Sequence, residues 1–416
     1  MTENHIPEKN FVQEEIREMP VNRRKLAAKL LVSALCGLVF ALCASLIFLI
    51  AIPAAGRRNQ QAENADETED TEALPETETE ESTEEKVVID YTVTVEDYQR
   101  IQNELYAIGR SVNKSVVMIT STGEAADWFN NTYETRDQIS GVIISETEEE
   151  YRIVTEAEAL PEENTVTVTF INEATASGEV RGRDLTTGIA IVAVAKKQLE
   201  AATRNAVAVA EAAEAGSIHS GQIAIALGSP LGSCYSILTG SITSTDKELS
   251  RTDNNFPILT TDIIGNDAGS GVLINTDGKI IGLITRENSN SEQQNTLTAI
   301  QMSEAQKLVE VMQKGSGVPY LGLKLSTVTN AIAYNYSIPR GVYVTETVMD
   351  SPAMLGGLQS GDVITQINGR AVDTTSEFYN YLLDCRPGSV CMIRAQRQNG
   401  QEYYEVTCTL TVGTLE

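Results

Sequence analysis

The stretch GVYVTETVMDSPAMLGGLQSGDVITQINGRAV, residues 341–372, contains the clearest succession of structural signals in the chain. It predicts a strand followed by a short helix, with Ser351 as the N-cap and Pro352 as the first helical residue. A Gly-Asp pair then indicates a turn into a second strand, and Asn368-Gly369 indicates a hairpin after that strand. The stretch therefore predicts a small module of mixed α and β structure.

A longer β-rich region precedes this module. After Ser115 the chain contains short runs rich in β-branched residues and divided by Gly, Asn and Asp, which is typical of a barrel or sandwich. These runs are VVMIT, SGVIIS, RIVT, TVTVTF, IAIVAV, QIAIALG, ILTGSIT, GVLI and KIIGLIT. Apolar residues at helical spacing predict a helix over 95–112, and further helices are expected at 303–315 and 375–384. The sequence thus predicts a mainly β protein.

Composition excludes some classes of function. The chain has 416 residues and a formal net charge of -27, which argues against nucleic-acid binding because that needs clustered Lys and Arg. Residues 59–86 are acidic and almost free of large apolar side chains, so we expect a disordered spacer there. The six cysteines include no CxxC and no Cys/His ligand spacing. We therefore expect no disulfide framework, no metal and no cofactor.

An uncharged apolar run extends from Leu30 to Gly56. As a helix it is long enough to cross a hydrocarbon core of about 30 Å. Four basic residues closely precede the run and two closely follow it: Arg23, Arg24, Lys25 and Lys29 before, and Arg57 and Arg58 after. This bias predicts that residues 1–29 lie in the cytoplasm and the rest of the chain outside. The alternative is a signal peptide cleaved after small residues at 54–56, but this run is longer than a usual signal core. The prediction is a single-pass protein of the cell membrane.

The order of the β-runs resembles that of HtrA/DegP-type serine proteases, in their trypsin-like domain (here 110–290) and their PDZ domain (here 318–412). The matching stretches are SGVII, GRD with IAIV, ALGSPLG with TGSITS, and TD with GSGVLIN and GKIIGLIT. The resemblance implies a trypsin-like double β-barrel followed by an α+β PDZ domain, with an N-terminal transmembrane helix. The expected parts are a cytoplasmic tail (1–29), a transmembrane helix (30–56), a disordered acidic linker (57–94), a trypsin-like domain (95–315) and a PDZ domain (316–416).

The resemblance also locates the family's Ser-His-Asp triad, in which a histidine held by an aspartate takes the proton of the serine. Glu158, in the turn TEAEAL, stands where the family has its histidine. Gly188, in DLTTGIA, stands where the family has its aspartate. The nucleophile motif reads DAGSGVL (267–273) and is one residue short, so either Ser270 or Gly269 occupies the nucleophile position. The sequence therefore predicts a degenerate triad.

Few other residues offer a base. His5 lies in the predicted cytoplasmic tail, and His219 is expected in a turn remote from the catalytic cleft. A Ser-Lys dyad would need a buried lysine beside the serine, and the nearest, Lys279, lies beyond a predicted turn. A carboxylate such as that of Glu158 is in general a far weaker base than imidazole.

The segment Tyr320-Leu321-Gly322-Leu323 resembles the PDZ loop that binds a peptide's C-terminal carboxylate with backbone amides, while the next strand pairs with the peptide. Nearby leucines and aromatic residues predict a preference for an apolar C-terminal side chain. The expected peptide-binding residues are Tyr320, Leu321, Gly322, Leu323, Leu325, Phe378, Tyr381 and Leu382. The alternative is that this domain packs only against its own protease-like domain.

Three functions fit these observations. The first is a membrane-anchored, extracytoplasmic HtrA-like pseudoprotease that binds polypeptide C-termini or unfolded proteins, in envelope protein quality control. The second is an active HtrA-type serine endopeptidase. The third is a non-catalytic regulatory partner of an active HtrA protease, since family members are commonly trimeric and the resemblance thus implies homo- or hetero-oligomers. The altered triad positions favour the first.

Overall fold

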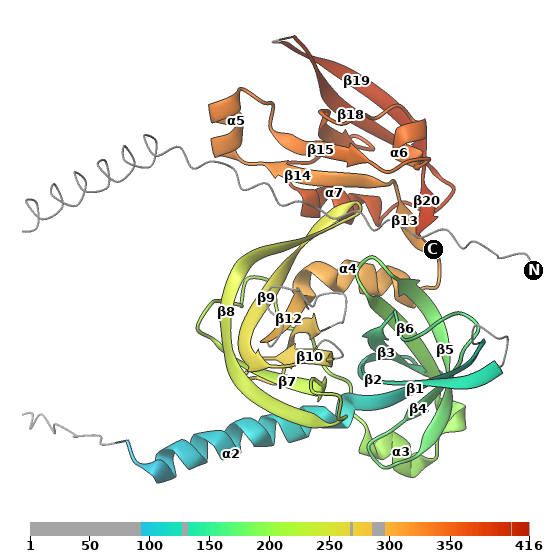
Figure 1. Ribbon diagram of the computed structural model, residues 1–416, viewed down its shortest axis with the longest axis vertical. Coiled ribbons are helices and arrows are strands. Elements are labelled where there is room, and N and C mark those ends of the chain that lie inside the picture. Colours follow the sequence, from blue (N-terminus) through green and yellow to red (C-terminus); the bar gives the residue numbers. More distant parts are fainter. Residues whose placement is uncertain (1–92, 127–131, 267–268, 285–295, 401, 416) are drawn as a thin grey trace, which may run out of the picture. The chain divides into compact units, whose positions relative to one another are not determined.

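The computed structural model describes residues 93–126, 132–266, 269–284, 296–400 and 402–415 (Figure 1). They form two closed six-stranded β-barrels and a further mixed sheet. The expectation of a mainly β fold, with two barrels and an α+β PDZ-like module, is confirmed. The predicted transmembrane helix at 30–56 lies outside the described residues. Among the helices in the described ranges, none is both long enough and apolar enough to cross a bilayer.

The first barrel has the strand order β1-β2-β3-β6-β5-β4, and all neighbouring strands are antiparallel. One apolar cluster, which includes Ile119, Ile153 and Val192, fills this barrel. Closing the sheet leaves no unpaired edge strand, so the barrel needs no further covering. The strands are β1 (Val116–Ala126), β2 (Thr132–Glu146), β3 (Glu150–Glu156), β4 (Thr165–Thr169), β5 (Thr175–Asp184) and β6 (Ile189–Ala195).

The second barrel has the order β10-β11-β12-β9-β8-β7. Alternate residues of β7 pack on opposite faces, as the twofold period of a strand requires. Ala224 and Ala226 belong to one apolar cluster, whereas Ile225 and Leu227 belong to a second cluster that also contains first-barrel residues such as Val142. The strands are β7 (Ile223–Ser229), β8 (Ser236–Arg251), β9 (Asn254–Ile264), β10 (Ser270–Ile274), β11 (Ile280–Ile284) and β12 (Thr296–Gln301).

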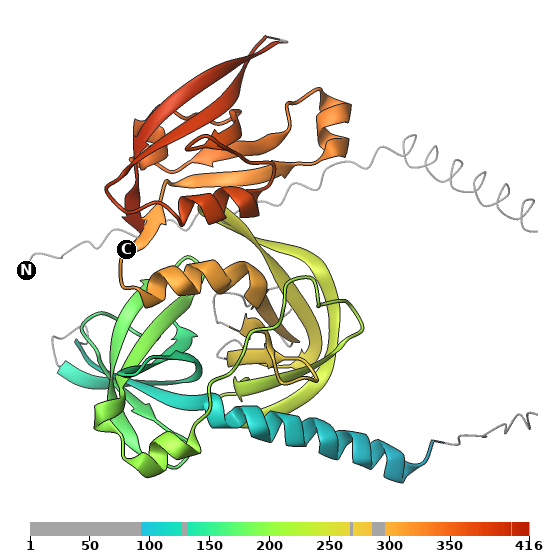
Figure 2. The ribbon, with the colours of Figure 1, turned by 180° about the vertical axis from the view of Figure 1, so that it is seen from behind.

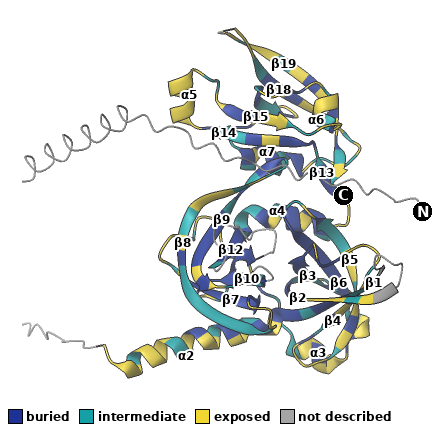
Figure 3. Cartoon of the chain, viewed as in Figure 1, coloured by how far each residue is buried: buried dark blue, intermediate teal, exposed yellow. Residues whose placement is uncertain are grey.

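Helix α2 (Val95–Val112) has the bounds that the apolar spacing predicted. Thr94 and Asp97 form a capping box, which satisfies backbone N–H groups at the start of the helix. Only the C-terminal half packs against the barrels, since Leu105 is buried while Tyr98 and Ile101 are 61% and 46% exposed. Figure 3 shows this helix as largely exposed. Three short elements complete this part: the 3₁₀ turns η1 (Asn113–Ser115) and η2 (Lys196–Gln198), and helix α3 (Ala201–Ala206).

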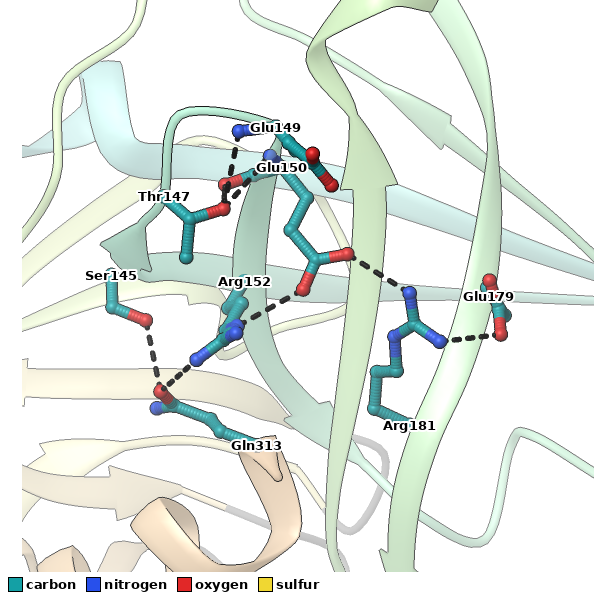
Figure 4. A network of polar contacts seen from close by, with 8 residues as sticks. All are labelled: Ser145, Thr147, Glu149, Glu150, Arg152, Glu179, Arg181 and Gln313. Carbon is teal, nitrogen blue, oxygen red and sulfur yellow. Dashed lines mark hydrogen bonds and ion pairs between the residues drawn. The ribbon is translucent and has the colours of Figure 1, made fainter. Parts of the chain in front are cut away.

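Helix α4 (Met302–Gln313) contacts strands of both barrels, and Figure 2 shows it from behind. Its bounds agree with the helix predicted at 303–315. Figure 4 shows how its last residue, Gln313, joins the first barrel: its Oε1 accepts hydrogen bonds from Ser145 Oγ at 3.0 Å and Arg152 Nη1 at 3.4 Å. Glu150 in turn pairs with Arg152 at 3.1 Å and with Arg181 at 2.9 Å. Burial opposes ionisation of Glu150, but both guanidinium groups outweigh it and lower its pKa.

The C-terminal module contains the order β14-β15-β16-β18-β19, with β17 also paired to β16, and a separate pair of β13 and β20. Its local predictions are confirmed. Ser351 caps the helix that starts at Pro352, and Asn368 and Gly369, both at positive φ, form the turn between β16 and β17. The strands are β13 (Val318–Tyr320), β14 (Leu323–Val328), β15 (Gly341–Thr347), β16 (Val363–Ile367), β17 (Arg370–Ala371), β18 (Val390–Asn399), β19 (Glu402–Thr411) and β20 (Gly413–Leu415), and the helices are α5 (Asn330–Tyr336), α6 (Pro352–Leu355) and α7 (Thr375–Leu382).

Candidate functional site

The positions of the family's histidine and aspartate lie side by side. Glu158 is exposed in the turn that follows β3, and Gly188 lies just before β6. The backbone N–H of Ala157 donates to the carbonyl oxygen of Gly188 at 2.9 Å, which joins the two turns. Gly188 has a φ of 73°, a left-handed conformation that glycine adopts without strain. The fold therefore brings together the two turns that carry Glu158 and Gly188, and the buried side chain of Glu156 lies one residue before Ala157.

The buried Asp184 fixes the loop that carries Gly188. Its Oδ1 accepts hydrogen bonds from Thr186 N at 2.8 Å and Thr186 Oγ1 at 2.7 Å, and its Oδ2 accepts one from Thr187 Oγ1 at 2.8 Å. A carboxylate that binds its own backbone two residues further on is a common turn device. Asp184 therefore organises the turn.

Ser270, the first residue of β10, is only 1% exposed. Its Oγ accepts a hydrogen bond from the Ser140 backbone N–H at 3.1 Å and lies 3.1 Å from Ser140 Oγ. The surroundings are tightly packed, since a Cβ on Gly228 would lie 2.5 Å from Ser140 Oγ. The Ser270 hydroxyl thus joins β10 to β2 in a buried contact between the two barrels.

Gly269, the other candidate for the nucleophile position, forms a tight turn. Its N–H donates to the Asn266 carbonyl oxygen at 2.9 Å, so this amide does not point freely into a site. A Cβ at Gly269 would lie 2.8 Å from the Pro230 carbonyl oxygen and 3.0 Å from that of Asn266. A serine side chain would fit there only after the backbone around it shifted.

His219 is the one histidine in the part of the chain that the structure describes, and it lies exposed in the turn before β7. Ser270 pairs with Ser229, the last residue of β7, so the histidine and the serine are at opposite ends of this strand. Its seven residues span about 20 Å at the usual rise of a strand. This placement agrees with the prediction of a turn histidine remote from the cleft. His5 lies outside the described residues, and Lys279 follows the turn after β10, as predicted.

The cavity beside these positions is very small. Ser140, Thr155, Ile189 and Gly271 are among the residues that line it, and its volume is about 10 Å³. That is room for about one water molecule, and the buried Glu156 also lines this cavity.

A second candidate site is the loop that the sequence identifies as carboxylate-binding. Gly322 has a φ of 84°, and a Cβ there would lie 2.3 Å from the Cβ of Ser351. Only glycine fits this position, and the turn it makes directs three successive backbone N–H groups, those of Leu321, Gly322 and Leu323, toward one point. Converging amides of this kind form an anion-binding nest.

Asp253, in the hairpin between β8 and β9, occupies this nest. Its Oδ2 accepts hydrogen bonds from Leu321 N at 2.8 Å and Gly322 N at 3.1 Å, and its Oδ1 accepts one from Leu323 N at 2.8 Å. The side chain is 2% exposed. Burial raises the pKa of Asp253 to about 6 although the three amides act to lower it, so the carboxyl is still mostly ionised at neutral pH. The sequence analysis did not identify this residue.

The hairpin also contacts strand β14, which follows this loop, and helix α7, which packs against β14; we call the surface between these two elements the groove. Asn255 Nδ2 donates to the Leu325 carbonyl oxygen at 3.1 Å, and the Phe256 ring packs edge-on against Tyr379 of α7 at 5.6 Å between ring centroids. Most of the predicted peptide-binding side chains are buried in the core, and two are partly exposed. The buried ones are Leu321, Leu323, Leu325, Phe378 and Leu382, and the partly exposed ones are Tyr320 and Tyr381.

Comparison with known proteins matches both modules. The family description "Trypsin-like peptidase domain" fits residues 139–283, and "PDZ domain" fits residues 319–408. The chain is 27% identical over 289 residues to "Serine protease Do-like HtrB" of Bacillus subtilis, covering 65% of this chain and 62% of the relative. It is 28% identical over 283 residues to "Probable periplasmic serine endoprotease DegP-like" of Halomonas elongata, covering 67% and 57%. The match thus spans somewhat less than two thirds of these relatives' length.

Solved structures show the same fold. "HtrA-type protease AlgW with tripeptide" superposes with a TM-score of 0.53 at 21% identity, over 74% of this chain and 96% of that one. "HtrA-type protease AlgW with decapeptide" gives a TM-score of 0.53 at 20% identity, over 74% and 98%. The chain therefore contains a trypsin-like peptidase domain and a PDZ domain, and it is similar to HtrA-type proteases in sequence and in fold.

Proposed function

We propose that this HtrA-family protein is a pseudoprotease, anchored in the membrane by residues 30–56, that binds polypeptide C-termini or unfolded proteins outside the cytoplasm. Its cellular role would be envelope protein quality control. The observation that carries the non-catalytic part is the environment of Ser270, whose hydroxyl is buried and hydrogen-bonded to Ser140. Both residues that should activate a nucleophile are replaced, by Glu158 and Gly188.

The chemical argument rests on proton transfer. A serine hydroxyl is a weak nucleophile until an adjacent base removes its proton. The exposed carboxylate of Glu158 is a weaker base than an imidazole and does not replace it adequately. The backbone N–H of Gly269 donates a hydrogen bond within its own turn, so it does not point toward the position of an oxyanion. Each of these features opposes acyl transfer by a different physical route.

Peptide binding is supported by the loop from Tyr320 to Leu323. Its converging amides have the geometry that captures a carboxylate, and β14, the strand with which a bound peptide would pair, follows directly. The solved relatives described above were determined with a tripeptide and a decapeptide bound. The apolar run at 30–56 and the basic residues before it support the proposed membrane anchor and extracytoplasmic location.

A fluorophosphonate probe tests the non-catalytic proposal. We expect the wild-type protein to show no more labelling than Ser270→Ala, because Glu158 and Gly188 stand where an active protease has its histidine and aspartate. Casein incubated with either protein should remain intact on a denaturing gel. An active HtrA-type protease, labelled in parallel, is the positive control. Labelling of the wild type that disappears in Ser270→Ala would establish the alternative, an active endopeptidase.

A further inference from the structure

The hairpin between β8 and β9 reproduces the contacts of a bound C-terminal residue. A peptide held by a carboxylate-binding loop gives its terminal carboxylate to the loop amides, and its backbone pairs with the following strand. Asp253 does both: its side-chain carboxylate accepts from the three loop amides, and its backbone N–H donates to the Leu323 carbonyl oxygen at 2.6 Å. The hairpin therefore provides both parts of a C-terminal residue, with the carboxylate coming from the side chain.

The contact continues along the groove. Leu325 lies two residues beyond Leu323 on β14, and its carbonyl oxygen accepts a hydrogen bond from Asn255. On the opposite wall, Phe256 packs against Tyr379 of α7. In Figure 1 the tip of the β8–β9 hairpin extends to β14 and α7, the two elements that form the groove. A peptide paired with β14 would need the same carbonyl oxygens and the same space.

The backbone of the hairpin is shaped for this contact. Arg251 pairs with Asn254, so the loop contains only Thr252 and Asp253. Asp253 has a φ of 67°, a left-handed conformation that few residues other than Gly, Asn and Asp adopt readily. An aspartate is thus compatible with the turn and also supplies the carboxylate that the nest binds.

A second contact holds the PDZ domain from another side. Lys307 of α4 pairs with Asp384 at 2.6 Å, and its ammonium group also donates to the Asn380 carbonyl oxygen. Ser376 of α7 donates to the carboxylate of Glu304 in α4. Helix α7 is therefore attached to α4 on one side, while the hairpin lies in the groove on its other side. These two contacts together favour a stable association of the hairpin with the PDZ domain over a transient one.

We propose that Asp253 is an internal substitute for a peptide's C-terminal carboxylate, so that the chain's own β8–β9 hairpin occupies the PDZ groove. The free C-terminus of a peptide then binds only by displacing the hairpin. That the competing ligand is a peptide C-terminus rests on the proposed function. When a competent state is only partly populated, the apparent dissociation constant rises in inverse proportion to its population. A hairpin bound about 90–99% of the time would weaken peptide binding by about tenfold to a hundredfold.

The variant Asp253→Asn removes the carboxylate but keeps a residue that suits the turn. Asparagine keeps the size of the side chain and tolerates the left-handed conformation, but its NH₂ group must face backbone N–H donors in the nest. The probe is a pool of fluorescent ten-residue peptides that end in valine, leucine or phenylalanine with a free carboxylate. We expect the pool to bind Asp253→Asn at least about tenfold more tightly than the wild type. The same peptides with amidated C-termini should bind neither protein.

Asp246→Asn is the matched control, because Asp246 is an exposed residue of β8 on the same hairpin. This variant should bind the peptides as the wild type does. Amide hydrogen exchange gives a readout that is independent of peptide: exchange at Leu321, Gly322 and Leu323 should be faster in Asp253→Asn than in the wild type or in Asp246→Asn. Circular dichroism would verify that all three proteins are folded.

The outcomes separate the two proposals. Unchanged exchange at the loop amides in Asp253→Asn would overturn the internal-ligand proposal. Equal peptide affinity for wild type and Asp253→Asn would overturn competition between hairpin and peptide. If exchange becomes faster but no free carboxylate binds either protein, the hairpin contact stands and the proposed peptide-binding function fails.

Discussion

Replacing Gly271 with alanine is expected to destabilise the protein by roughly 3–5 kcal/mol, the sum of a strained backbone and an overpacked contact. Gly271 has a φ of 131°, a conformation that side chains with a Cβ rarely adopt. A Cβ there would lie 2.0 Å from the carbonyl oxygen of Leu227, which belongs to the paired strand β7. Because the neighbouring atoms are backbone, they cannot move without breaking the ladder. Chemical denaturation followed by circular dichroism measures the loss.

Gly221→Ala is the matched control for this prediction. Gly221 also has a positive φ, 87°, and lies in the turn before β7 of the same barrel, but a Cβ there would meet no atom within 4 Å. This variant should show only the cost of the backbone conformation, about 1 kcal/mol. Equal losses in the two variants would contradict the claim that the close approach of β10 to β7 dominates at Gly271.

Features encoded by neighbouring residues could be predicted from the sequence. The apolar spacing predicted the bounds of helix α2, and Asn368-Gly369 correctly indicated a two-residue turn, because local sequence patterns decide both. The resemblance also placed Glu158 and Gly188 at turns that lie side by side. The sequence left open whether Ser270 or Gly269 takes the nucleophile position, because the motif is one residue short and the path of the backbone through it cannot be predicted from the sequence.

Contacts between residues distant in sequence could not be predicted in the same way. Nothing near Asp253 indicates that its carboxylate binds amides about 70 residues further along the chain. The hydrogen bond between Ser140 and Ser270 joins residues separated by 130 positions, from opposite barrels. The apolar spacing predicted helix α2 but not which part of it packs: Leu105 is buried, whereas Tyr98 and Ile101 are exposed. Such features depend on how helices and strands that are distant in sequence pack against one another.

Both candidate sites share one physical property, which the sequence motifs alone do not reveal. In each, polar groups that could serve a substrate are bonded within the chain: the hydroxyl of Ser270 to Ser140, and the loop amides to Asp253. Satisfying buried polar groups internally stabilises the fold, because an unpaired one would cost about 1–3 kcal/mol. Exchanging an internal partner for an external one is then a competition, and its balance decides whether a site binds anything else.

Arg397→Met provides the second large expected effect, in the sheet that carries the carboxylate-binding loop. Arg397 Nε and Nη2 donate to the two oxygens of Asp362, both at 2.7 Å, and Nη2 also donates to the Gly357 carbonyl oxygen at 2.8 Å. Hydrogen bonding to Asp362 raises the pKa of Arg397 above its usual value. Asp362 is 1% exposed, so removal of the guanidinium leaves a buried carboxylate with a single amide donor, from Gln359. We expect a loss of about 3–5 kcal/mol of stability.

The double variant Asp362→Asn, Arg397→Met identifies the origin of that loss. With the buried charge removed as well, the protein should regain part of the stability lost in Arg397→Met, because most of the penalty comes from an unpaired charge and not from the missing contact. Chemical denaturation of the wild type, both single variants and the double variant completes the cycle. If the double variant is no more stable than Arg397→Met, the lost packing of the arginine side chain would account for the effect, and Asp362 would not require its partner.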